Sequence, residues 1–417
     1  MNKLRIGILG ASRGFDFADR IPTSYPYAEI SAICEFYEPL CQKADQYFKE
    51  RNRDVACFTD YDDFLNSGID GVIIANYANE HIPYVLAALE KKIHVLCEDM
   101  PVQTLAEAVA LCDAVEKSGC VYAYAENCCY FDFTFPFRLH YDAGDIGEAV
   151  CLEGTFINDC SPRWHLLTRG IRDHWRNYVP STFYCSHGIG PLFFSTGLRS
   201  TRVNGVEMPR MDYLMENGAR SGSAAMELME LSNGGMAKNL NGNLRHPYEI
   251  SYRIIGSEGT MEVFDHTFRI YRYKGGHEFE RTLPPASYYS FPHRPEGDLG
   301  AFPNGDLASF GHFIGKILGD PISTKYSIDV YQALDMSLPG LLAYRSILDG
   351  GQPYAVPDMR DKAVRQAYAN DHYCTDPRTP DPYRLPTSKS GTPEVDENIY
   401  KAVQQRFASA HLKPGGN

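Results

Sequence analysis

The sequence has no run of basic residues and no apolar stretch long enough to cross a membrane. Its formal net charge is −13 over 417 residues. An acidic chain without basic clusters is a poor partner for nucleic acid or for an anionic membrane surface, so we expect neither. Lys3 leads directly into a first apolar segment. We therefore also expect no signal peptide, and a cytoplasmic protein.

The 12 cysteines include no Cys-x-x-Cys pair. Most stand singly in apolar segments, and the adjacent Cys128 and Cys129 have poor geometry for a disulfide or a zinc site. The cysteines are thus expected to be buried free thiols in a reducing compartment, with no metal bound.

Residues 1–125 alternate between expected strands and helices. The expected strands are 4–9, 29–34, 71–75, 93–97 and 120–125, and the expected helices are 39–51, 80–91 and 104–118. Short connections between strands and helices predict an α/β Rossmann domain with a doubly wound parallel sheet. In such a domain, ligands bind beyond the carboxyl ends of the strands.

After residue 130 the pattern changes to closely spaced strands joined by turns rich in glycine and asparagine. The expected strands are 149–158, 224–231, 235–241, 249–256, 261–264 and 267–273, and helices are expected at 306–318, 327–349 and 394–409. This pattern predicts an α+β C-terminal domain with a largely antiparallel open sheet. The expected domains are therefore 1–125 and 126–350, with the last helix of the second domain free to pack back on the Rossmann domain. A C-terminal extension, 351–417, could wrap the surface or reach a neighbouring subunit.

The first expected strand runs into a glycine turn, Gly10-Ala11-Ser12-Arg13-Gly14. Such a turn between a strand and a helix lets backbone N–H groups approach a dinucleotide pyrophosphate. It departs from the usual Gly-x-Gly-x-x-Gly, because Ser12 replaces the second glycine and Gly14 comes early. Glu35 closes the second expected strand, where a carboxylate can accept hydrogen bonds from ribose hydroxyls. No Arg or Lys flanks Glu35, which favours NAD over NADP.

Polar residues also follow the later strands of this sheet. They are Asn76, Asn79, His81, Glu98, Asp99 and Asn127. The carboxyl ends of parallel strands meet at one edge of the sheet, where the cofactor is expected. Asn79 could equally cap the next helix, and both roles stay open.

The order of these motifs resembles the Gfo/Idh/MocA oxidoreductase family over most of residues 1–350. The resemblance implies a Rossmann domain, an open-sheet second domain, bound NAD(P), sugar or cyclitol substrates, and a homo-oligomer such as a dimer or tetramer. The cofactor-binding residues that we expect are Gly10, Ser12, Arg13, Gly14, Glu35, Asn76, Asn79, His81, Glu98 and Asn127.

Two departures from the family pattern point to one branch of it. The family usually carries Glu-Lys-Pro where this chain has Glu98-Asp99-Met100-Pro101, so the lysine is missing. The later Asp-x-x-x-His signature is replaced by residues 184–191, which include His187. Together with residues 126–130, these features resemble the NAD-dependent glycosidases of the superfamily, such as the α-N-acetylgalactosaminidase-like enzymes. This resemblance assigns Tyr130 and His187 as the catalytic proton-transfer residues.

The chemistry of hydride removal from a secondary alcohol agrees with such residues. The reaction needs a base for the hydroxyl proton, and a histidine is suited to that role near neutral pH. A tyrosine needs a lowered pKa or a positive neighbour to act as a base. The alternatives are that the backbone satisfies His187 at a helix start, and that Tyr130 is a core aromatic.

A segment dense in aromatic and cationic residues is the candidate sugar site, because aromatic faces stack on a pyranose ring and Arg or His binds its hydroxyls. The expected substrate-binding residues are Asp99, Trp164, Arg172, His174, Trp175 and Arg176. Asp99 could instead hold a loop, and the segment could be an ordinary solvated loop. Weaker candidates are His246-Pro247-Tyr248 and His293-Arg294.

The branch resemblance predicts an NAD-dependent enzyme that oxidises a sugar ring hydroxyl, at C3, only transiently. The oxidation would be coupled to cleavage of a glycoside by elimination and hydration. One alternative is a net NAD-dependent dehydrogenase of a sugar, glycoside or cyclitol. Another is a non-catalytic sugar sensor, which suits the missing lysine but not the retained His187 and Tyr130.

Overall fold

The computed structural model describes residues 3–246, 249–283, 293 and 301–411. The chain divides into two compact units. The first unit comprises residues 1–138, 285–334 and 359–370, and the second comprises 139–284, 335–358 and 371–417. Each unit therefore combines separated parts of the chain, whereas the sequence pattern predicts contiguous domains with boundaries at 125 and 350.

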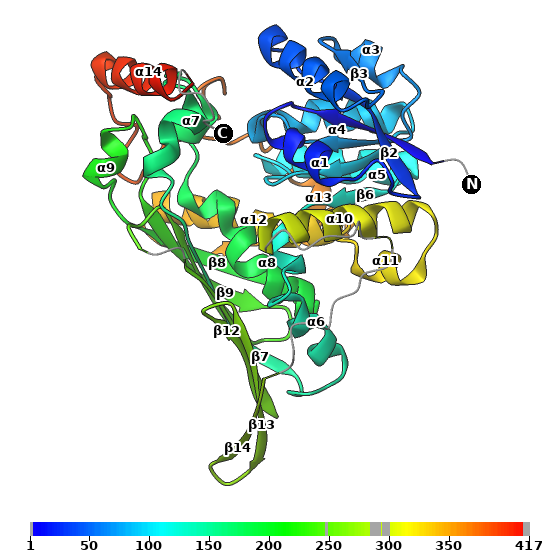
Figure 1. Ribbon diagram of the computed structural model, residues 1–417. Coiled ribbons are helices and arrows are strands. Elements are labelled where there is room, and N and C mark those ends of the chain that lie inside the picture. Colours follow the sequence, from blue (N-terminus) through cyan, green and yellow to red (C-terminus); the bar gives the residue numbers. More distant parts are fainter. Residues whose placement is uncertain (1–2, 247–248, 284–292, 294–300, 412–417) are drawn as a thin grey trace. The chain divides into compact units, whose positions relative to one another are not determined.

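The first unit contains a six-stranded sheet in the order β3-β2-β1-β4-β5-β6. Its strands are β1 Leu4–Leu9, β2 Ala28–Cys34, β3 Ala56–Phe58, β4 Gly71–Ile74, β5 His94–Cys97 and β6 Tyr122–Tyr124. Figure 1 labels the strands β2, β3 and β6 of this sheet. All neighbouring strands are parallel. This is the strand order of a doubly wound Rossmann domain, and it confirms the predicted fold class. The order reverses between β1 and β4, so ligands are expected beyond the carboxyl ends of these two strands.

Helices of the first unit come from both ends of the chain. They are α1 Arg13–Arg20, α2 Glu38–Glu50, α3 Tyr61–Leu65, α4 His81–Glu90, α5 Leu105–Ser118, α10 Ala301–Ile317, α11 Pro321–Tyr326 and α13 Lys362–Gln366. The late helix α10 packs against α1, β5 and β6. Its Leu307, Phe310 and Phe313 share a core with Ile6 and Ile8 of β1. Burial of this apolar face explains why residues 301–317 belong with the Rossmann sheet.

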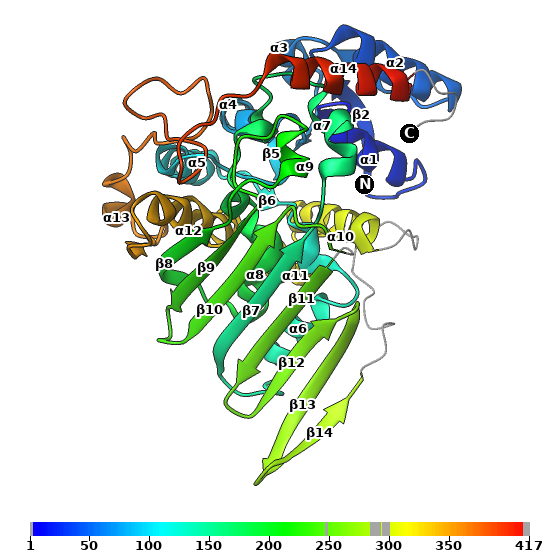
Figure 2. The same cartoon turned by 90° about the vertical axis from the view of Figure 1, so that its left-hand side faces the viewer.

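The second unit contains a nine-stranded sheet in the order β14-β13-β12-β11-β7-β10-β9-β8-β15 (Figure 2). Its strands are β7 Ala149–Ile157, β8 Ser200–Glu207, β9 Ala224–Leu231, β10 Met236–Gly242, β11 Glu249–Gly256, β12 Gly259–Phe264, β13 Thr267–Gly275, β14 Glu278–Thr282 and β15 Tyr354–Ala355. Only β7 and β10 pair in parallel, and all other neighbouring strands are antiparallel. The predicted, largely antiparallel sheet is thus confirmed.

One face of this sheet is covered and the other is exposed. The helix α8 Cys185–Thr196 packs against β7, β10 and β11. Along β9, Met226 and Leu228 are exposed while Glu227 and Met229 are buried, which is the two-residue alternation of a sheet with one solvated face. The smaller helices of the unit are α7 Trp164–Thr168, α9 Asp212–Met215 and α14 Glu397–His411.

Two helices continue along the chain from one unit into the other, α6 Phe135–Asp142 and α12 Val330–Leu348. Among the helices of the described ranges, none is both long and apolar enough to span a membrane.

Candidate active site

The glycine turn joins β1 to α1 at the carboxyl edge of the first sheet. Gly10 has φ +96°, and a Cβ at this position would lie 2.6 Å from the Ala75 carbonyl oxygen. A Cβ at Gly14 would lie 2.3 Å from the Ile8 side chain, so α1 begins directly against β1. Ser12 stands at the N-cap of α1 without a side-chain cap bond. The turn therefore has the backbone conformation and close packing of a pyrophosphate cradle.

Glu35 is held against the same turn. Its Oε2 accepts a hydrogen bond from the Ala11 N–H at 2.8 Å, and its Oε1 accepts one from the Tyr37 N–H at 3.0 Å. A carboxylate has about four acceptor positions, so these two bonds leave capacity for ribose hydroxyls. The position of Glu35 therefore suits the predicted contact with the cofactor ribose.

Two residues after β4 have different roles: His81 holds two loops together, and Asn76 has an amide that can bind a ligand. The ring nitrogens of buried His81 lie 3.0 Å from the Met100 carbonyl oxygen and 3.4 Å from that of Asn76. Burial lowers the pKa of His81 to about 4, so the ring is neutral and ties the loops after β4 and β5 together. By contrast, neither the Nδ2 nor the Oδ1 atom of Asn76, both buried, has a partner in the described part of the chain. A buried amide of this kind is a group that a bound cofactor would satisfy.

Asn79 lies in a short turn before α4. The N-cap position of α4 is Glu80, so Asn79 lies one residue before it. The backbone carbonyl of Asn79 accepts a hydrogen bond from Gln103 Nε2 at 2.8 Å. These contacts connect the turn to the segment before α5, and the role of the Asn79 side chain toward a cofactor stays a prediction.

Replacing Gly10 by alanine is expected to weaken NAD binding roughly tenfold or more, because about 1–3 kcal/mol of backbone strain would distort the turn. The matched control is Gly119→Ala at the end of α5, where φ is +65° but a Cβ would meet nothing within 4 Å. Both variants carry the cost of a positive φ, and only the first disturbs the cradle. Fluorescence titration with NAD checks this, and equal NAD affinity of the two variants would contradict it.

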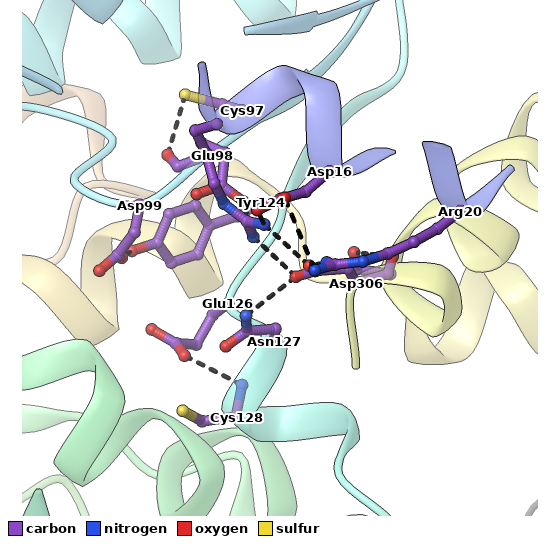
Figure 3. A network of polar contacts seen from close by, with 12 residues as sticks. Asp16, Arg20, Cys97, Glu98, Asp99, Tyr124, Glu126, Asn127, Cys128 and Asp306 are labelled. Atoms are coloured by element: carbon purple, nitrogen blue, oxygen red, sulfur yellow. Dashed lines mark hydrogen bonds and ion pairs between the residues drawn. The ribbon is translucent and has the colours of Figure 1, made fainter. Parts of the chain in front are cut away.

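Arg13 and Asp306 form the centre of an ionic network in the first unit. Figure 3 shows Asp306 of this network with Glu98, Arg20 and Asn127. Arg13 Nη2 lies 2.8 Å from Glu98 Oε1 and 2.8 Å from Asp306 Oδ1, and Nη1 lies 2.9 Å from Asp306 Oδ2. The Asp306 carboxylate also pairs with Arg20 and accepts a bond from Asn127 Nδ2 at 2.9 Å. Burial raises the pKa of Glu98, and the Arg13 charge opposes that rise. The network joins three predicted residues, Arg13, Glu98 and Asn127. Asp306, which links them, was not among the residues predicted from the sequence.

Asp99, which stands where the family usually has its lysine, is held by Tyr124. The Tyr124 hydroxyl donates a hydrogen bond to the Asp99 carboxylate (Figure 3). This contact supports the alternative in which Asp99 holds a loop, and it gives no direct support to the predicted contact with substrate.

Tyr130 occupies the position of a core aromatic. Its hydroxyl donates to the Tyr326 carbonyl oxygen at 2.7 Å and accepts from the Ile328 N–H at 3.3 Å. Burial raises the pKa of Tyr130 well above its usual value. A phenol held in this way does not release its proton near neutral pH. The geometry therefore argues against the proton-transfer role that the resemblance implies.

His187 lies in the first turn of α8, in the second unit, and belongs to a row of rings. Its ring centre is 4.6 Å from that of Phe156 and 5.6 Å from that of Tyr184. Tyr184 is followed by Trp175 at 6.5 Å, and Trp175 by His174 at 6.0 Å. We call this row, Phe156, His187, Tyr184, Trp175 and His174, the aromatic wall.

Arg176 adds a cation to the aromatic wall. Its guanidinium lies 4.5 Å from the centre of the Trp175 ring and 5.8 Å from that of Tyr184. The buried indole N–H of Trp175 has no hydrogen-bond partner among the described residues. His174 is buried, accepts a bond from the Arg176 N–H at 3.3 Å, and has a pKa lowered to about 3 by burial. His174 therefore supports the wall. Its members Tyr184 and His187 are partly exposed, as is Arg176 beside it.

The remaining sugar-site candidates make other contacts. Trp164 is buried, and its Nε1 donates to Asn177 Oδ1 at 3.0 Å. Arg172 pairs with Glu397 of α14 at 3.1 Å. Both side chains therefore hold residues 164–178 in place through contacts within the protein. Of the weaker candidates, Pro247, Tyr248 and Arg294 lie outside the described residues.

A buried carboxyl group lies on β9, on the face of the sheet that α8 covers. Asn239 Nδ2 donates to Glu227 Oε2 at 3.0 Å and to the carbonyl oxygen of Cys185, the first residue of α8, at 3.3 Å. A Cβ at Gly154 of β7 would lie 2.1 Å from the Gly188 carbonyl oxygen, so α8 rests directly on the sheet. Burial raises the pKa of Glu227 to about 8. Sequence reasoning missed Glu227. Its one signal in the sequence is that a charged residue occupies a position that the alternation of apolar and polar residues along the strand assigns to the buried face.

The raised pKa of Glu227 predicts a pH-dependent stability. Between pH 4.5 and about 8 the folded protein holds a proton that the unfolded chain has released, so the free energy of unfolding falls as pH rises. The slope is about 1.4 kcal/mol per pH unit at most. Glu227→Gln is expected to remove this slope, since glutamine keeps an acceptor for Asn239 and does not titrate. Urea unfolding from pH 5 to 8 checks it, and identical slopes for the two proteins would contradict it.

Comparisons with known proteins identify the first domain. Residues 4–126 match the Gfo/Idh/MocA family, described as an oxidoreductase family with an NAD-binding Rossmann fold. The chain is 27% identical over 286 residues to glycosyl hydrolase family 109 protein 5 of Phocaeicola vulgatus, covering 62% of this chain and 55% of that protein. It is 25% identical over 349 residues to a glycosyl hydrolase family 109 protein of Stenotrophomonas maltophilia, covering 72% and 74%. The chain thus spans little more than half the length of the Phocaeicola relative.

Solved structures share the fold. Levoglucosan dehydrogenase in complex with NADH and L-sorbose has a TM-score of 0.68 at 16% identity, covering 86% of this chain and 100% of that one. An inositol dehydrogenase homolog from Azotobacter vinelandii, complexed with NADH and myo-inositol, has a TM-score of 0.66 at 16% identity, covering 85% and 98%.

The comparisons confirm the predicted family resemblance and the predicted NAD-binding domain. Residues 4–126 of this chain are an NAD-binding domain of the Gfo/Idh/MocA oxidoreductase family, and proteins named glycosyl hydrolase family 109 are among the chain's relatives.

Proposed function

We propose that this protein is an NAD-dependent carbohydrate-active enzyme that oxidises a sugar ring hydroxyl transiently and thereby cleaves a glycoside. The observation that carries the proposal is the aromatic wall. In it, His187 at the start of α8 is connected through Tyr184 to Trp175, and the Arg176 guanidinium lies over the Trp175 ring. The names of the sequence relatives support the same activity.

The first unit supplies the groups that would hold the cofactor. The backbone of the turn at Gly10 would hold the pyrophosphate, the Glu35 carboxylate would bind the ribose, and the buried Asn76 amide would gain the partner it lacks within the described chain. When bound there, NAD supplies an acceptor for a hydride from a ring carbon and returns the hydride later in the turnover.

The second unit supplies the base and the sugar-binding surface. Tyr184 offers a ring face to the pyranose, and Arg176 and the Trp175 indole N–H offer hydrogen-bond donors to its hydroxyls. We assign His187 as the general base that takes the proton of the C3 hydroxyl. The bonded, buried hydroxyl of Tyr130 leaves His187 as the proposed proton-transfer residue.

The sugar chemistry that follows is redox-neutral. Once C3 is a ketone, the C2 proton becomes acidic and is lost to solvent. The C2–H electron pair then forms a C1–C2 double bond as the aglycone leaves C1 and takes up a proton from solvent. Water then adds its hydroxyl to C1 and a proton returns to C2. Reduction of the C3 ketone, with the proton returned by His187, completes a net hydrolysis.

Simultaneous recording of 340 nm absorbance and released aglycone tests the proposal on a panel of aryl and natural glycosides. We expect aglycone release without accumulation of NADH. Stoichiometric NADH with an intact glycosidic bond would instead show a net dehydrogenase, the second function that a histidine base can serve. Sugar binding with neither signal would show a sensor and overturn both enzymatic functions.

We also propose that the protein acts in the cytoplasm as a dimer or tetramer. The uncovered face of the nine-stranded sheet exposes Met226, Leu228 and Met236, which are apolar side chains suited to an interface. Light scattering coupled to size-exclusion chromatography checks the oligomer, and a monomeric mass at micromolar concentration would contradict it.

A further inference from the structure

The C-terminal segment, defined here as residues 386–411, packs within the second unit on the part of the chain that carries the aromatic wall. Tyr400 of α14 is only 1% exposed. Its hydroxyl donates to the Gly218 carbonyl oxygen at 3.1 Å and accepts from Arg220 Nε at 3.1 Å. Arg220, itself 4% exposed, also donates to the Pro393 carbonyl oxygen at 3.2 Å. The segment is thus joined to residues 218–220 at two points, by buried hydrogen bonds at Tyr400 and by a partly buried one at Pro393.

A second set of contacts joins α14 to the loop 164–178. Gln404 Nε2 donates to the Gly170 carbonyl oxygen at 3.1 Å. Gly170 has φ +66°, and a Cβ there would lie 2.6 Å from the Gln404 backbone nitrogen and 2.7 Å from the Tyr400 carbonyl oxygen. Backbone therefore lies directly against backbone, and the loop can take this path only with glycine at position 170.

Asn177 transmits these contacts to the aromatic wall. Its Nδ2 donates to the carbonyl oxygens of Ile171 and Arg172 at 3.1 and 3.2 Å, and its Oδ1 accepts from Trp164. Its own carbonyl oxygen accepts from the Arg220 N–H at 2.8 Å. The loop is therefore closed on itself around Asn177 and bonded to Arg220, the partner of Tyr400. His174 and Trp175 of the loop belong to the wall, and Arg176 of the loop lies over the Trp175 ring.

We propose that the C-terminal segment is a determinant of sugar recognition, because it positions the loop 164–178 from which Trp175 and Arg176 reach the sugar. Tyr400 and Gln404 are positioning residues that act through Arg220 and Gly170. The proposal rests on the proposed function insofar as the aromatic wall is taken as the sugar site. It gives the extension a role within its own unit, in contrast to contact with a neighbouring subunit.

The two tryptophans of the chain, Trp164 and Trp175, both lie in this loop, so tryptophan fluorescence reports on the loop alone. Tyr400→Phe keeps the ring and removes the hydroxyl, and Gln404→Ala removes the bond to Gly170. Gln405→Ala is the matched control, since Gln405 is exposed on the same helix. Acrylamide quenching, the KM for a cleaved glycoside, and the NAD affinity are measured for all three variants and the wild type.

We expect acrylamide quenching to increase in both variants. KM should rise roughly tenfold or more in Tyr400→Phe, which loses two buried hydrogen bonds, and by a smaller factor in Gln404→Ala, whose bond to Gly170 is only partly buried. The NAD affinity and the Gln405→Ala variant are expected to match the wild type. Unchanged quenching would overturn the proposal, because the segment would not hold the loop. Increased quenching with an unchanged KM would also overturn it, because the segment would be structural only. If no glycoside changes the tryptophan fluorescence of the wild type, the wall is not the sugar site. The quenching of the variants still tests whether the segment holds the loop.

Discussion

Replacing His187 by glutamine is expected to lower glycoside turnover by ~10²–10⁴-fold, the usual contribution of a general base. Glutamine keeps a polar side chain beside Phe156 and Tyr184 but cannot take the C3 hydroxyl proton. The NAD affinity should not change, since the cofactor cradle lies in the first unit, and neither should sugar binding to the rest of the aromatic wall. The rate of aglycone release at saturating glycoside measures the effect.

The same substitution at His277 is the control for His187→Gln. His277 is exposed between β13 and β14, so His277→Gln should keep the wild-type rate. If His187→Gln turned over within about threefold of the His277 control, far above the range for a lost general base, His187 would not be the base.

Removing the Asp306 carboxylate is expected to destabilise the first unit by about 3–5 kcal/mol, the cost of breaking a buried ion pair from one side. Asp306 is 1% exposed and pairs with both Arg13 and Arg20, which would keep their charges without this buried partner. We expect Asp306→Ala to lower NAD affinity as well, because Arg13 is the first residue of the helix that follows the glycine turn. Urea unfolding with and without NAD measures both effects.

Asp16→Ala is the matched control for Asp306→Ala. Asp16 pairs with the same Arg13 at 3.0 Å but its side chain is 47% exposed, so its loss should cost no more than about 1 kcal/mol. If both variants lost the same small amount of unfolding free energy, the buried network would not stabilise the unit.

The residues proposed to hold the cofactor could be grouped from sequence because their signals are local. Gly10 and Glu35 lie within one strand-turn-helix-strand unit, and the conformation of that unit is set by neighbours in the chain. The Asp306 network could not be predicted in this way, since Arg13 and Asp306 are 293 residues apart. The pattern at 306–318 predicts a helix, but it does not tell which sheet the apolar face of that helix covers.

The proposed sugar site shows where a role carried over by resemblance needs the structure. Tyr130 stands in the expected motif, yet its hydroxyl bonds a carbonyl 196 residues away, a contact that no local pattern reveals. Tyr184 and Phe156 join the wall from separate elements, so their part in it becomes visible only when the sheet and α8 are packed together.

Four strands lie outside the ranges expected from the sequence, β3, β8, β14 and β15. Two of them, β3 and β14, have a clear physical reason. The strand β3 has only three residues, too few to show an alternation of apolar and polar side chains. The edge strand β14 has exposed or half-buried positions throughout, so it lacks the apolar alternation that marks a strand with a buried face.

Glycoside cleavage in heavy water tests the central claim, transient oxidation, most directly. With a C2-protiated glycoside and no NAD added beyond the amount bound, the account predicts that the released sugar carries one deuterium at C2 and that no NADH accumulates. Release of the aglycone with only protium at C2 would contradict the elimination step, and with it the proposal that oxidation at C3 drives the cleavage.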